Sequence, residues 1–364
     1  MGFRCGIIGL PNVGKSTIFN ALTAAGAEVA NYPFCTIDPN IGIVRVPDKR
    51  LEKIAGIIKP PKVTYTTMEF VDIAGLVKGA SRGEGLGNKF LGHIREMDAL
   101  VHVIRCFDNP DVVHLDGDVD PERDIGIVNM ELVLADLETV ERRFQKAEKM
   151  AKTGDKNAAQ ELHFYRRLRD ALGKGIPARK TPVEEEFKEL MRELHLLTAK
   201  KMLYVANVSE DVLRKGNGYI RQVEDCAKRD DSPSIVICGD LEAEMTELSE
   251  DERAAFLKDL GLDESGLDKL IRSGYGMLDL ITFYTTVGTE LRAWTVEAGT
   301  RAPQAAGKIH SDMERGFIRA EVVHYDDFIN SGGIQAAKER GLLHSEGKDY
   351  QIKDGDIVLF RFNV

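Results

Sequence analysis

Short apolar segments alternate with helical segments along much of the chain. Apolar runs of strand length occur at residues 5–8, 67–71, 99–104, 201–206 and 234–237. Residues 16–25, which follow the first run, have the composition and spacing of a helix. Short apolar strands separated by helices are typical of a parallel sheet with helices on both faces. The pattern therefore predicts an α/β fold, with a mostly parallel sheet, over most of the chain.

The alternation of strands and helices is interrupted between about residues 128 and 198. This stretch is rich in Ala, Glu, Leu, Lys and Arg. Its apolar positions follow three- and four-residue spacing at Leu132, Leu134, Leu137, Val140 and Phe144. A break at residues 153–155 is followed by renewed helical spacing from Ala158 to Leu172. We expect an antiparallel helical hairpin, inserted between two strands of the sheet.

The pattern changes again from about residue 278. Strand-like runs surround a helical stretch at residues 305–311, and a turn at residues 353–356 precedes a last strand at residues 357–362. This arrangement predicts a compact α+β module over residues 278–364. Residues 1–277 then form the larger α/β domain, which includes the hairpin.

Charge and composition restrict the class of partner. The 364-residue chain carries a net charge of −10, so the molecule as a whole is not a polycation that coats nucleic acid. Residues 141–180 differ, because they hold twelve basic and five acidic residues. This local excess of positive charge fits a solvated helical arm, and it also fits an electrostatic contact to RNA phosphates. Both alternatives stay open.

The cysteines and the longest apolar runs bear on the compartment. The five cysteines are odd in number and form no C-x-x-C pair, which argues against a disulfide framework and against a zinc site. No apolar run approaches the ~20 residues that a membrane helix needs. The first residues also lack the charged and apolar regions of a signal peptide. We therefore expect a soluble cytoplasmic protein without a membrane partner.

Residues 9–17 carry the most specific motif of the chain. Their sequence, Gly-Leu-Pro-Asn-Val-Gly-Lys-Ser-Thr, matches the P-loop pattern G-x-x-x-x-G-K-[ST] between an apolar strand and a helix. Lys15 would supply positive charge to the β- and γ-phosphates, and the Ser16 hydroxyl would be a ligand of Mg²⁺. The motif predicts a site for a purine nucleoside triphosphate with Mg²⁺. The expected nucleotide-binding residues of this loop are Asn12, Val13, Gly14, Lys15, Ser16 and Thr17.

A second motif, Asp72-Ile73-Ala74-Gly75, follows the strand at residues 67–71. Asp72 can hold Mg²⁺ through water, and the Gly75 N–H can contact the γ-phosphate. Between the two motifs, Thr36 is the best candidate for a second hydroxyl ligand of Mg²⁺, although spacing alone leaves Thr23 open. Four more glycines follow at Gly79, Gly83, Gly85 and Gly87. They indicate either a mobile loop that senses the nucleotide or a long surface turn.

The segment after the strand at residues 201–206 bears on the choice of base. GTP-specific proteins carry N-K-x-D there, and its Asp accepts hydrogen bonds from guanine. The chain has Asn207-Val208-Ser209-Glu210, which lacks both the Lys and the Asp. The Val208 carbonyl could instead accept from the adenine N6 amine, while Asn207 bonds N7 or N6. The segment therefore predicts ATP over GTP.

Three residues bear on how the water that attacks the γ-phosphate would be activated. Leu76 stands where many switch GTPases place a Gln that orients the attacking water, so we expect slow hydrolysis or another catalytic group. His114 is a candidate for that group, and an ordinary surface histidine is the alternative. Asn12 could help to hold K⁺ against the phosphates, so K⁺ is an open candidate cofactor beside Mg²⁺. The expected catalytic residues are Lys15, Asp72, Gly75 and His114.

Together these residues resemble the YchF family of Obg-like ATPases. The resemblance covers essentially the whole chain and rests on residues 2–6, 9–17, 31–39, 70–87, 207–210 and 302–310. It implies a P-loop G domain with an inserted helical hairpin, and a C-terminal TGS domain with a ubiquitin-like β-grasp fold. It further implies that ATP is accepted or preferred and that the protein associates with ribosomes. On the same basis, Ser16 and Thr36 would bind Mg²⁺ and His114 would be catalytic.

Two functional hypotheses from different classes follow. The first is an enzyme that hydrolyses ATP slowly to ADP and phosphate, and thereby gates binding to a ribosome (large subunit or 70S) or to RNA. The second is a non-catalytic, ATP-gated adaptor on ribosomes or RNA, which the missing Gln at Leu76 favours. A GTP-driven translation factor is disfavoured by residues 207–210.

Overall fold

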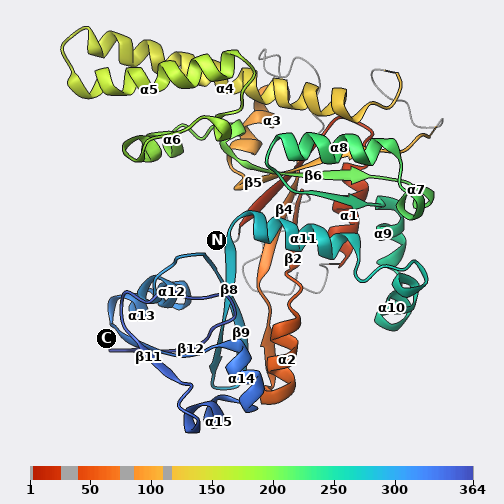
Figure 1. The fold of residues 1–364 in the computed structure, drawn as a ribbon, viewed down its shortest axis with the longest axis vertical. Helices are drawn as coiled ribbons and strands as arrows, with labels where there is room; N and C mark the ends of the chain where they lie inside the picture. The colour runs from red at the N-terminus through yellow and green to blue at the C-terminus, as the bar shows by residue number, and fades with distance from the viewer. Residues whose placement is uncertain (1–2, 26–39, 74–85, 110–116, 364) are drawn as a thin grey trace. The chain divides into compact units, whose positions relative to one another are not determined.

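The computed structural model describes residues 3–25, 40–73, 86–109 and 117–363 (Figure 1). Contacts within the chain divide it into two units. The first unit comprises Met1–Val44 and Glu69–Leu270, and the second comprises Arg45–Met68 and Ile271–Val364. Among the described residues, no helix is long and apolar enough to cross a membrane.

A six-stranded sheet forms the centre of the first unit, in the order β2-β4-β1-β5-β6-β7. Its strands are β1 (Arg4–Ile8), β2 (Ile41–Arg45), β4 (Thr67–Asp72), β5 (Ala99–Arg105), β6 (Lys201–Asn207) and β7 (Ser234–Ile237). Five of them, from β4 to β7 in this order, pair in parallel. Every residue of β5 is buried, which explains why its apolar run is continuous rather than alternating. The expected α/β fold class with a mostly parallel sheet is confirmed.

Helices pack against this sheet, with α1 on β1, α4 on β5 and α8 on β6 and β7. The α-helices of this unit are α1 (Lys15–Ala25), α3 (Leu86–Arg95), α4 (Pro121–Ala151), α5 (Lys156–Gly173), α6 (Lys188–Glu193), α7 (Glu210–Lys215), α8 (Gly218–Arg229), α9 (Gly239–Met245) and α10 (Glu250–Asp259). Helix α11 (Gly266–Met277) is divided between the two units after Leu270. Short 3₁₀ turns lie at Ala178–Lys180, Glu185–Phe187 and Leu197–Ala199.

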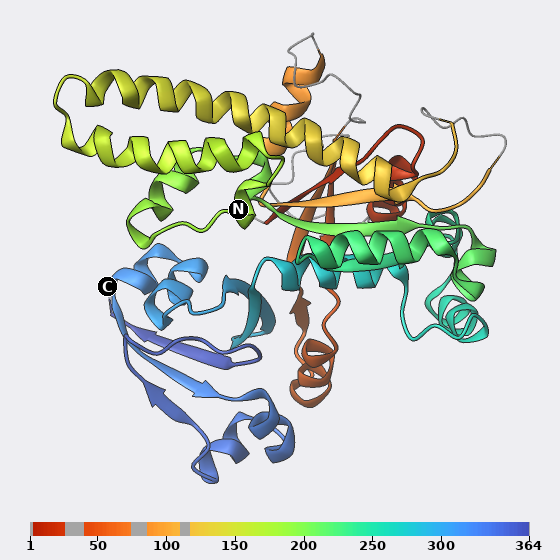
Figure 2. The same cartoon turned by 45° about the horizontal axis from the view of Figure 1, so that its top comes forward.

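Helices α4 and α5 lie side by side in both views, between β5 and β6 in the sequence (Figure 2). Phe144 of α4 and Leu168 of α5 belong to one buried cluster. Helix α4 begins at Pro121, earlier than the change in composition near residue 128, because Asp120 caps its N-terminus. Leu134 shares the helical spacing of the buried positions but is 40% exposed.

The second unit contains another six-stranded sheet, in the order β11-β10-β12-β8-β9-β3. Its strands are β3 (Lys62–Thr64), β8 (Leu280–Val287), β9 (Glu290–Glu297), β10 (Phe317–Val323), β11 (His344–Glu346) and β12 (Ile357–Phe362). Its helices are α2 (Lys49–Ile58), α12 (Ala302–Ile309), α13 (Ser311–Arg315), α14 (Tyr325–Ser331) and α15 (Ile334–Glu339). Two buried clusters form, one around Phe283 and the other around Tyr284, because neighbouring strand residues point to opposite faces.

Residues 45–68 belong to the second unit, although the sequence pattern placed them in the domain of residues 1–277. Strand β3 pairs in parallel with β9, and Leu51 and Ile54 of α2 are buried in the same cluster as Tyr284. The expected boundary at residue 278 therefore leaves out the edge strand and one helix of this unit. The pairing joins segments more than two hundred residues apart, and no change in composition marks it.

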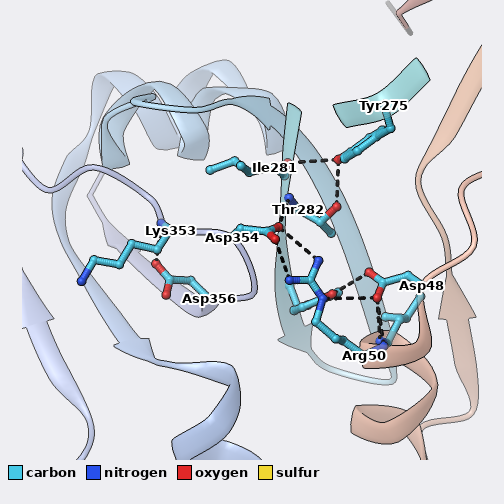
Figure 3. Close-up of polar contacts among 10 residues, drawn as sticks. Asp48, Arg50, Tyr275, Ile281, Thr282, Lys353, Asp354 and Asp356 are labelled. Atoms are coloured by element: carbon cyan, nitrogen blue, oxygen red, sulfur yellow. Dashed lines mark hydrogen bonds and ion pairs between the residues drawn. The ribbon is translucent and has the colours of Figure 1, made fainter. Parts of the chain in front are cut away.

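A polar network fixes the start of α2 within the second unit (Figure 3). Asp48 caps α2 by accepting from the Arg50 backbone N–H at 2.9 Å, and its other oxygen accepts from the Tyr284 hydroxyl at 2.5 Å. The Arg50 guanidinium donates to both carboxylate oxygens of Asp354, at 2.8 and 3.1 Å. Burial and the Asp48 charge raise the pKa of Tyr284, which keeps its hydroxyl a donor.

We expect Asp48→Ala to lower the free energy of unfolding of the second unit by about 2 to 3 kcal/mol, because it removes a helix cap and leaves a buried tyrosine hydroxyl without its acceptor. Urea denaturation, with hydrogen exchange in α2 and β9 as the local readout, measures the loss. Asp349→Ala is the control, because that side chain is 92% exposed in its ion pair with Arg301. An equal loss in the two variants would contradict the expected role of Asp48.

Candidate phosphate-binding site

The loop between β1 and α1 adopts a backbone that only glycine allows at two positions. Gly9 has φ of +149°, and a Cβ there would lie 2.4 Å from the Val103 carbonyl oxygen. Gly14 has φ of +93°, and a Cβ there would lie 2.1 Å from Nδ2 of Asn207. Asn12 is also left-handed, with φ of 62°. The loop therefore wraps closely, as a backbone that cradles phosphate must.

Lys15, the first residue of α1, lies inside this loop. Its ammonium donates to the Leu10 carbonyl at 2.6 Å, and the residue is only 7% exposed. Burial lowers the pKa of Lys15 to about 8, while the nearby Asp72 opposes the shift. Burial therefore disfavours the charged form of Lys15, and a bound anionic phosphate would offset this cost.

Ser16 and Asp72 meet at the end of β4. The Ser16 hydroxyl donates to Oδ2 of Asp72 at 3.2 Å, while Oδ1 of Asp72 is buried and has no hydrogen-bond partner. Burial raises the pKa of Asp72, against the effects of Ser16 and Lys15. A hydroxyl beside a carboxylate with an unsatisfied oxygen fits the hard oxygen ligands that Mg²⁺ prefers. In the described part of the chain, no group of three His, Cys, Asp or Glu residues could hold a metal ion.

A cavity of about 500 Å³ opens above this loop. It is lined by Asn12, Gly14, Lys15, Ser16, Thr17, Phe107, Asp108, Asn109, Asn207, Val208, Ser209 and Asp240. These residues follow the carboxyl ends of β1, β5, β6 and β7, which is where parallel sheets bind ligands. Its volume is within the usual range for a small-molecule site.

Asn207 links the phosphate loop to the next strand connection. Its Nδ2 donates to the Val13 carbonyl at 2.9 Å, and its Oδ1 accepts from the Gly239 N–H at 3.0 Å. The side chain therefore has a positioning role that the sequence did not predict. An amide NH₂ has two hydrogens, so a contact to a base stays a prediction. Val208 is a buried residue of the cavity lining, and its N–H donates to the Ile237 carbonyl at 2.8 Å.

The sequence reasoning missed the loop after β5 and the start of α9. Phe107, Asp108 and Asn109 follow β5 directly, and Asp240 lies in the first turn of α9. The buried Arg105 shapes the loop, because its guanidinium donates to the carbonyls of Phe107 and Asn109, both at 3.1 Å. Their positions just after apolar strands, at the edge that carries the P-loop, were the available signal.

Other expected site residues lie outside the described residues. These are Thr36, Gly75, Leu76 and His114, together with Gly79, Gly83 and Gly85. The second ligand of Mg²⁺, the γ-phosphate contact and the water-activating group therefore remain predictions from the sequence.

Two protein-family models match the chain. The YchF-GTPase_C model, described as a protein of unknown function (DUF933), matches residues 280–363. A model described as a 50S ribosome-binding GTPase matches residues 4–135, which include the phosphate loop and Asp72.

Curated relatives match over the full length. The chain is 52% identical over 366 residues to the ribosome-binding ATPase YchF of Bacillus subtilis, and 52% identical over 364 residues to that of Escherichia coli O157:H7, with 100% of each chain covered. A solved structure of the Schizosaccharomyces pombe YchF GTPase has a TM-score of 0.90 at 37% identity, covering 99% of this chain and 98% of that one. A GTP-binding protein from Pyrococcus horikoshii shares the fold, with a TM-score of 0.62 at 18% identity.

The affinity for Mg²⁺–ATP should fall as the pH rises through about 8, because the empty site then holds a neutral Lys15. The free group has a lowered pKa and the triphosphate favours its charged form, so binding above pH 8 must take up a proton. We expect a dissociation constant roughly tenfold higher at pH 9 than at pH 7.5. Calorimetric titration measures it. Lys15→Ala should bind weakly with little pH dependence, and a wild type equally insensitive to pH would contradict this role of Lys15.

Proposed function

The chain belongs to the YchF family, and from this membership and the phosphate-loop geometry we propose that it is a Mg²⁺-dependent ATPase that binds the ribosome according to its nucleotide state. The observation that carries the proposal is the cavity at Lys15 and Ser16, whose loop conformation requires glycine at positions 9 and 14. Curated relatives that match the whole chain are named ribosome-binding ATPases. The proposed reaction is ATP and water to ADP and phosphate.

Each residue of the site has a proposed task. Loop N–H groups and the Lys15 ammonium bind the phosphates, with Lys15 stabilising the charge that develops at the β–γ bridge. Ser16 and Thr36 would hold Mg²⁺, with Asp72 acting through water. When bound, Mg²⁺ neutralises phosphate charge. The unsatisfied Oδ1 of Asp72 supports this arrangement, since it provides an acceptor for a metal-bound water.

Adenine is the proposed base. The segment Asn207-Val208-Ser209-Glu210 lacks the Lys and Asp that read guanine, and Val208 and Ser209 both line the cavity. The Val208 carbonyl would accept from the N6 amine, and the remaining Asn207 N–H would donate to N7. Because the Asn207 amide also holds the phosphate loop, base and phosphates would be sensed by one side chain.

Hydrolysis is proposed to be slow in the isolated protein. Leu76 cannot orient the attacking water as a Gln would, so His114 or a bound K⁺ beside Asn12 would have to assist. Asn12 lines the cavity and has a left-handed backbone, which supports this proposal. Slow turnover suits a switch whose partner accelerates the reaction.

The hairpin of α4 and α5 is the proposed electrostatic contact to ribosomal RNA. Arg143, Lys146 and Lys149 are exposed along α4, in the stretch where twelve basic residues outnumber five acidic ones. Some neighbouring charges are neutralised by ion pairs within the helix, such as Lys152 with Glu148 at 3.4 Å. An exposed basic face on an acidic protein favours a local phosphate contact over general binding to nucleic acid.

Single-turnover hydrolysis with and without ribosomes tests the switch. We expect 70S particles to raise the rate constant at least about tenfold, because the water-orienting group is incomplete in the free protein. Lys15→Ala should abolish both rates, and EDTA should do the same. Ribosome binding without any stimulation would support the alternative, a non-catalytic ATP-gated adaptor, and would contradict the enzyme.

Nucleotide preference is tested by competitive titration. We expect ATP to bind at least about tenfold more tightly than GTP, since guanine would present N1–H and amine donors to a site without the matching carboxylate. A Glu210→Asp, Val208→Lys double variant partly restores the guanine-reading sequence and should narrow the difference. Tighter binding of GTP by the unmodified chain would reverse the assignment of the base.

A further inference from the structure

Two histidine side chains meet at the β11 edge of the sheet in the second unit. His324 directly follows β10 and is the N-cap residue of α14, and His344 is the first residue of β11. The two strands are antiparallel with Val322 opposite His344, so His324 is a diagonal cross-strand neighbour of His344. The centroids of the two imidazole rings lie 5.8 Å apart, and the ring planes are tilted by 36°. Strand pairing therefore brings together two imidazoles that are not adjacent in the sequence.

A buried carboxylate orients the first of these rings. Nδ1 of His324 lies 2.7 Å from Oδ1 of Asp356, whose side chain is only 1% exposed. The other oxygen of Asp356 accepts from the Tyr350 hydroxyl at 2.8 Å and from the Lys353 backbone N–H at 2.9 Å. Because a carboxylate held by such donors acts as an acceptor, Nδ1 of His324 carries the hydrogen. Nε2 of His324 therefore keeps its lone pair, on a side chain that is 36% exposed.

This arrangement is typical of a histidine that binds a metal ion. Metal-binding histidines usually donate their second ring N–H to a carboxylate or carbonyl, which fixes the tautomer and the orientation of the ring. His344 is exposed, and among the described residues it has no hydrogen bond or ion pair. Both His324 and His344 can therefore offer a nitrogen lone pair without losing an existing contact.

The distance between the rings suits zinc. Zn–N bonds are about 2.0–2.1 Å long in a tetrahedral geometry, so two imidazoles on one Zn²⁺ have centroids roughly 5 Å apart. The observed 5.8 Å therefore requires a movement of less than about 1 Å. Imidazole nitrogen is a good ligand for Zn²⁺, Ni²⁺ and Cu²⁺, whereas Mg²⁺ prefers oxygen. The two histidines thus differ in metal preference from Ser16 and Asp72 of the phosphate site.

We propose that His324 and His344 together bind one divalent transition-metal ion, with Zn²⁺ as the occupant and Asp356 as the carboxylate that orients His324. Water would fill the remaining coordination positions, because no group of three His, Cys, Asp or Glu residues in the described part of the chain could hold a metal ion. Such an open site is suited to an exchangeable ion rather than to one that the fold requires. The proposal is independent of ATP binding, since all three residues belong to the second unit.

Calorimetric titration of the full chain with Zn²⁺, in excess Mg²⁺ so that oxygen sites are filled, measures the affinity. We expect one saturable site that depends on both histidines. Electron paramagnetic resonance of a Cu²⁺-loaded sample counts the nitrogen ligands independently, and two imidazole nitrogens are the expected result.

His324→Ala and His344→Ala should each weaken Zn²⁺ binding by at least about tenfold and lower the nitrogen count from two to one. His344→Ala is the decisive variant, because that exposed side chain has no other polar partner among the described residues. Asp356→Asn keeps both ligands, so it should weaken binding by about tenfold while the count stays at two. His310→Ala is the matched control, since it removes another histidine of the same unit, with a 64% exposed side chain. Thermal denaturation of each variant verifies that the unit is folded.

Unchanged Zn²⁺ affinity in His344→Ala would overturn the proposal. A loss confined to His324→Ala would also overturn it, because the pair of His324 with Asp356 would then have a structural role only. An equal loss in His310→Ala would do the same, since scattered surface imidazoles would then account for the bound metal. Hydrolysis of Mg²⁺–ATP should be unchanged in all of these variants, so failure of the zinc site would leave the proposed ATPase intact, and loss of the ATPase would leave the zinc result standing.

Discussion

The close approach of Gly14 to the Asn207 amide is the constraint on which the rest of the site depends. It joins the loop after β1 to the end of β6, and the same amide accepts from the start of α9. The ends of β1, β6 and β7 are thereby held next to one another around one cavity. The buried Lys15 ammonium donates to the Leu10 carbonyl of the same loop. Phosphate binding is thus prepared by contacts among residues that are far apart in sequence.

Local motifs and apolar periodicity predicted the parallel sheet and the closely wrapped loop at residues 9–17. They succeeded because each depends on a strand, a turn and a helix that are adjacent in the chain. The sequence assigned Ser16 and Asp72 to one Mg²⁺ site without predicting the hydrogen bond between them. Arg105 and Asp240 were missed, because their importance arises only when the ends of β5 and β7 are brought beside the loop. The double role of Asn207 was missed for the same reason.

The assignment of residues 45–68 to the second unit shows that apolar periodicity does not identify the core against which a helix packs. Helix α2 has an amphipathic pattern of its own, but the pattern does not say which core receives Leu51 and Ile54. The partners that fix it, Tyr284 and Asp354, come more than two hundred residues later. A polar contact of such sequence separation has no local sequence signal, whereas the strand at residues 357–362 was predicted from its own composition and the turn before it.

The chain passes from one unit to the other at residues 45, 69 and 271, so the smaller unit is assembled from two pieces of the polypeptide. During synthesis, α2 and β3 must wait for more than two hundred further residues before β8 and β9 exist to receive them. In that interval, Leu51 and Ile54 of α2 lack the strands that bury them in the finished unit. For the same reason, recombination could not transfer this unit to another protein as one continuous cassette.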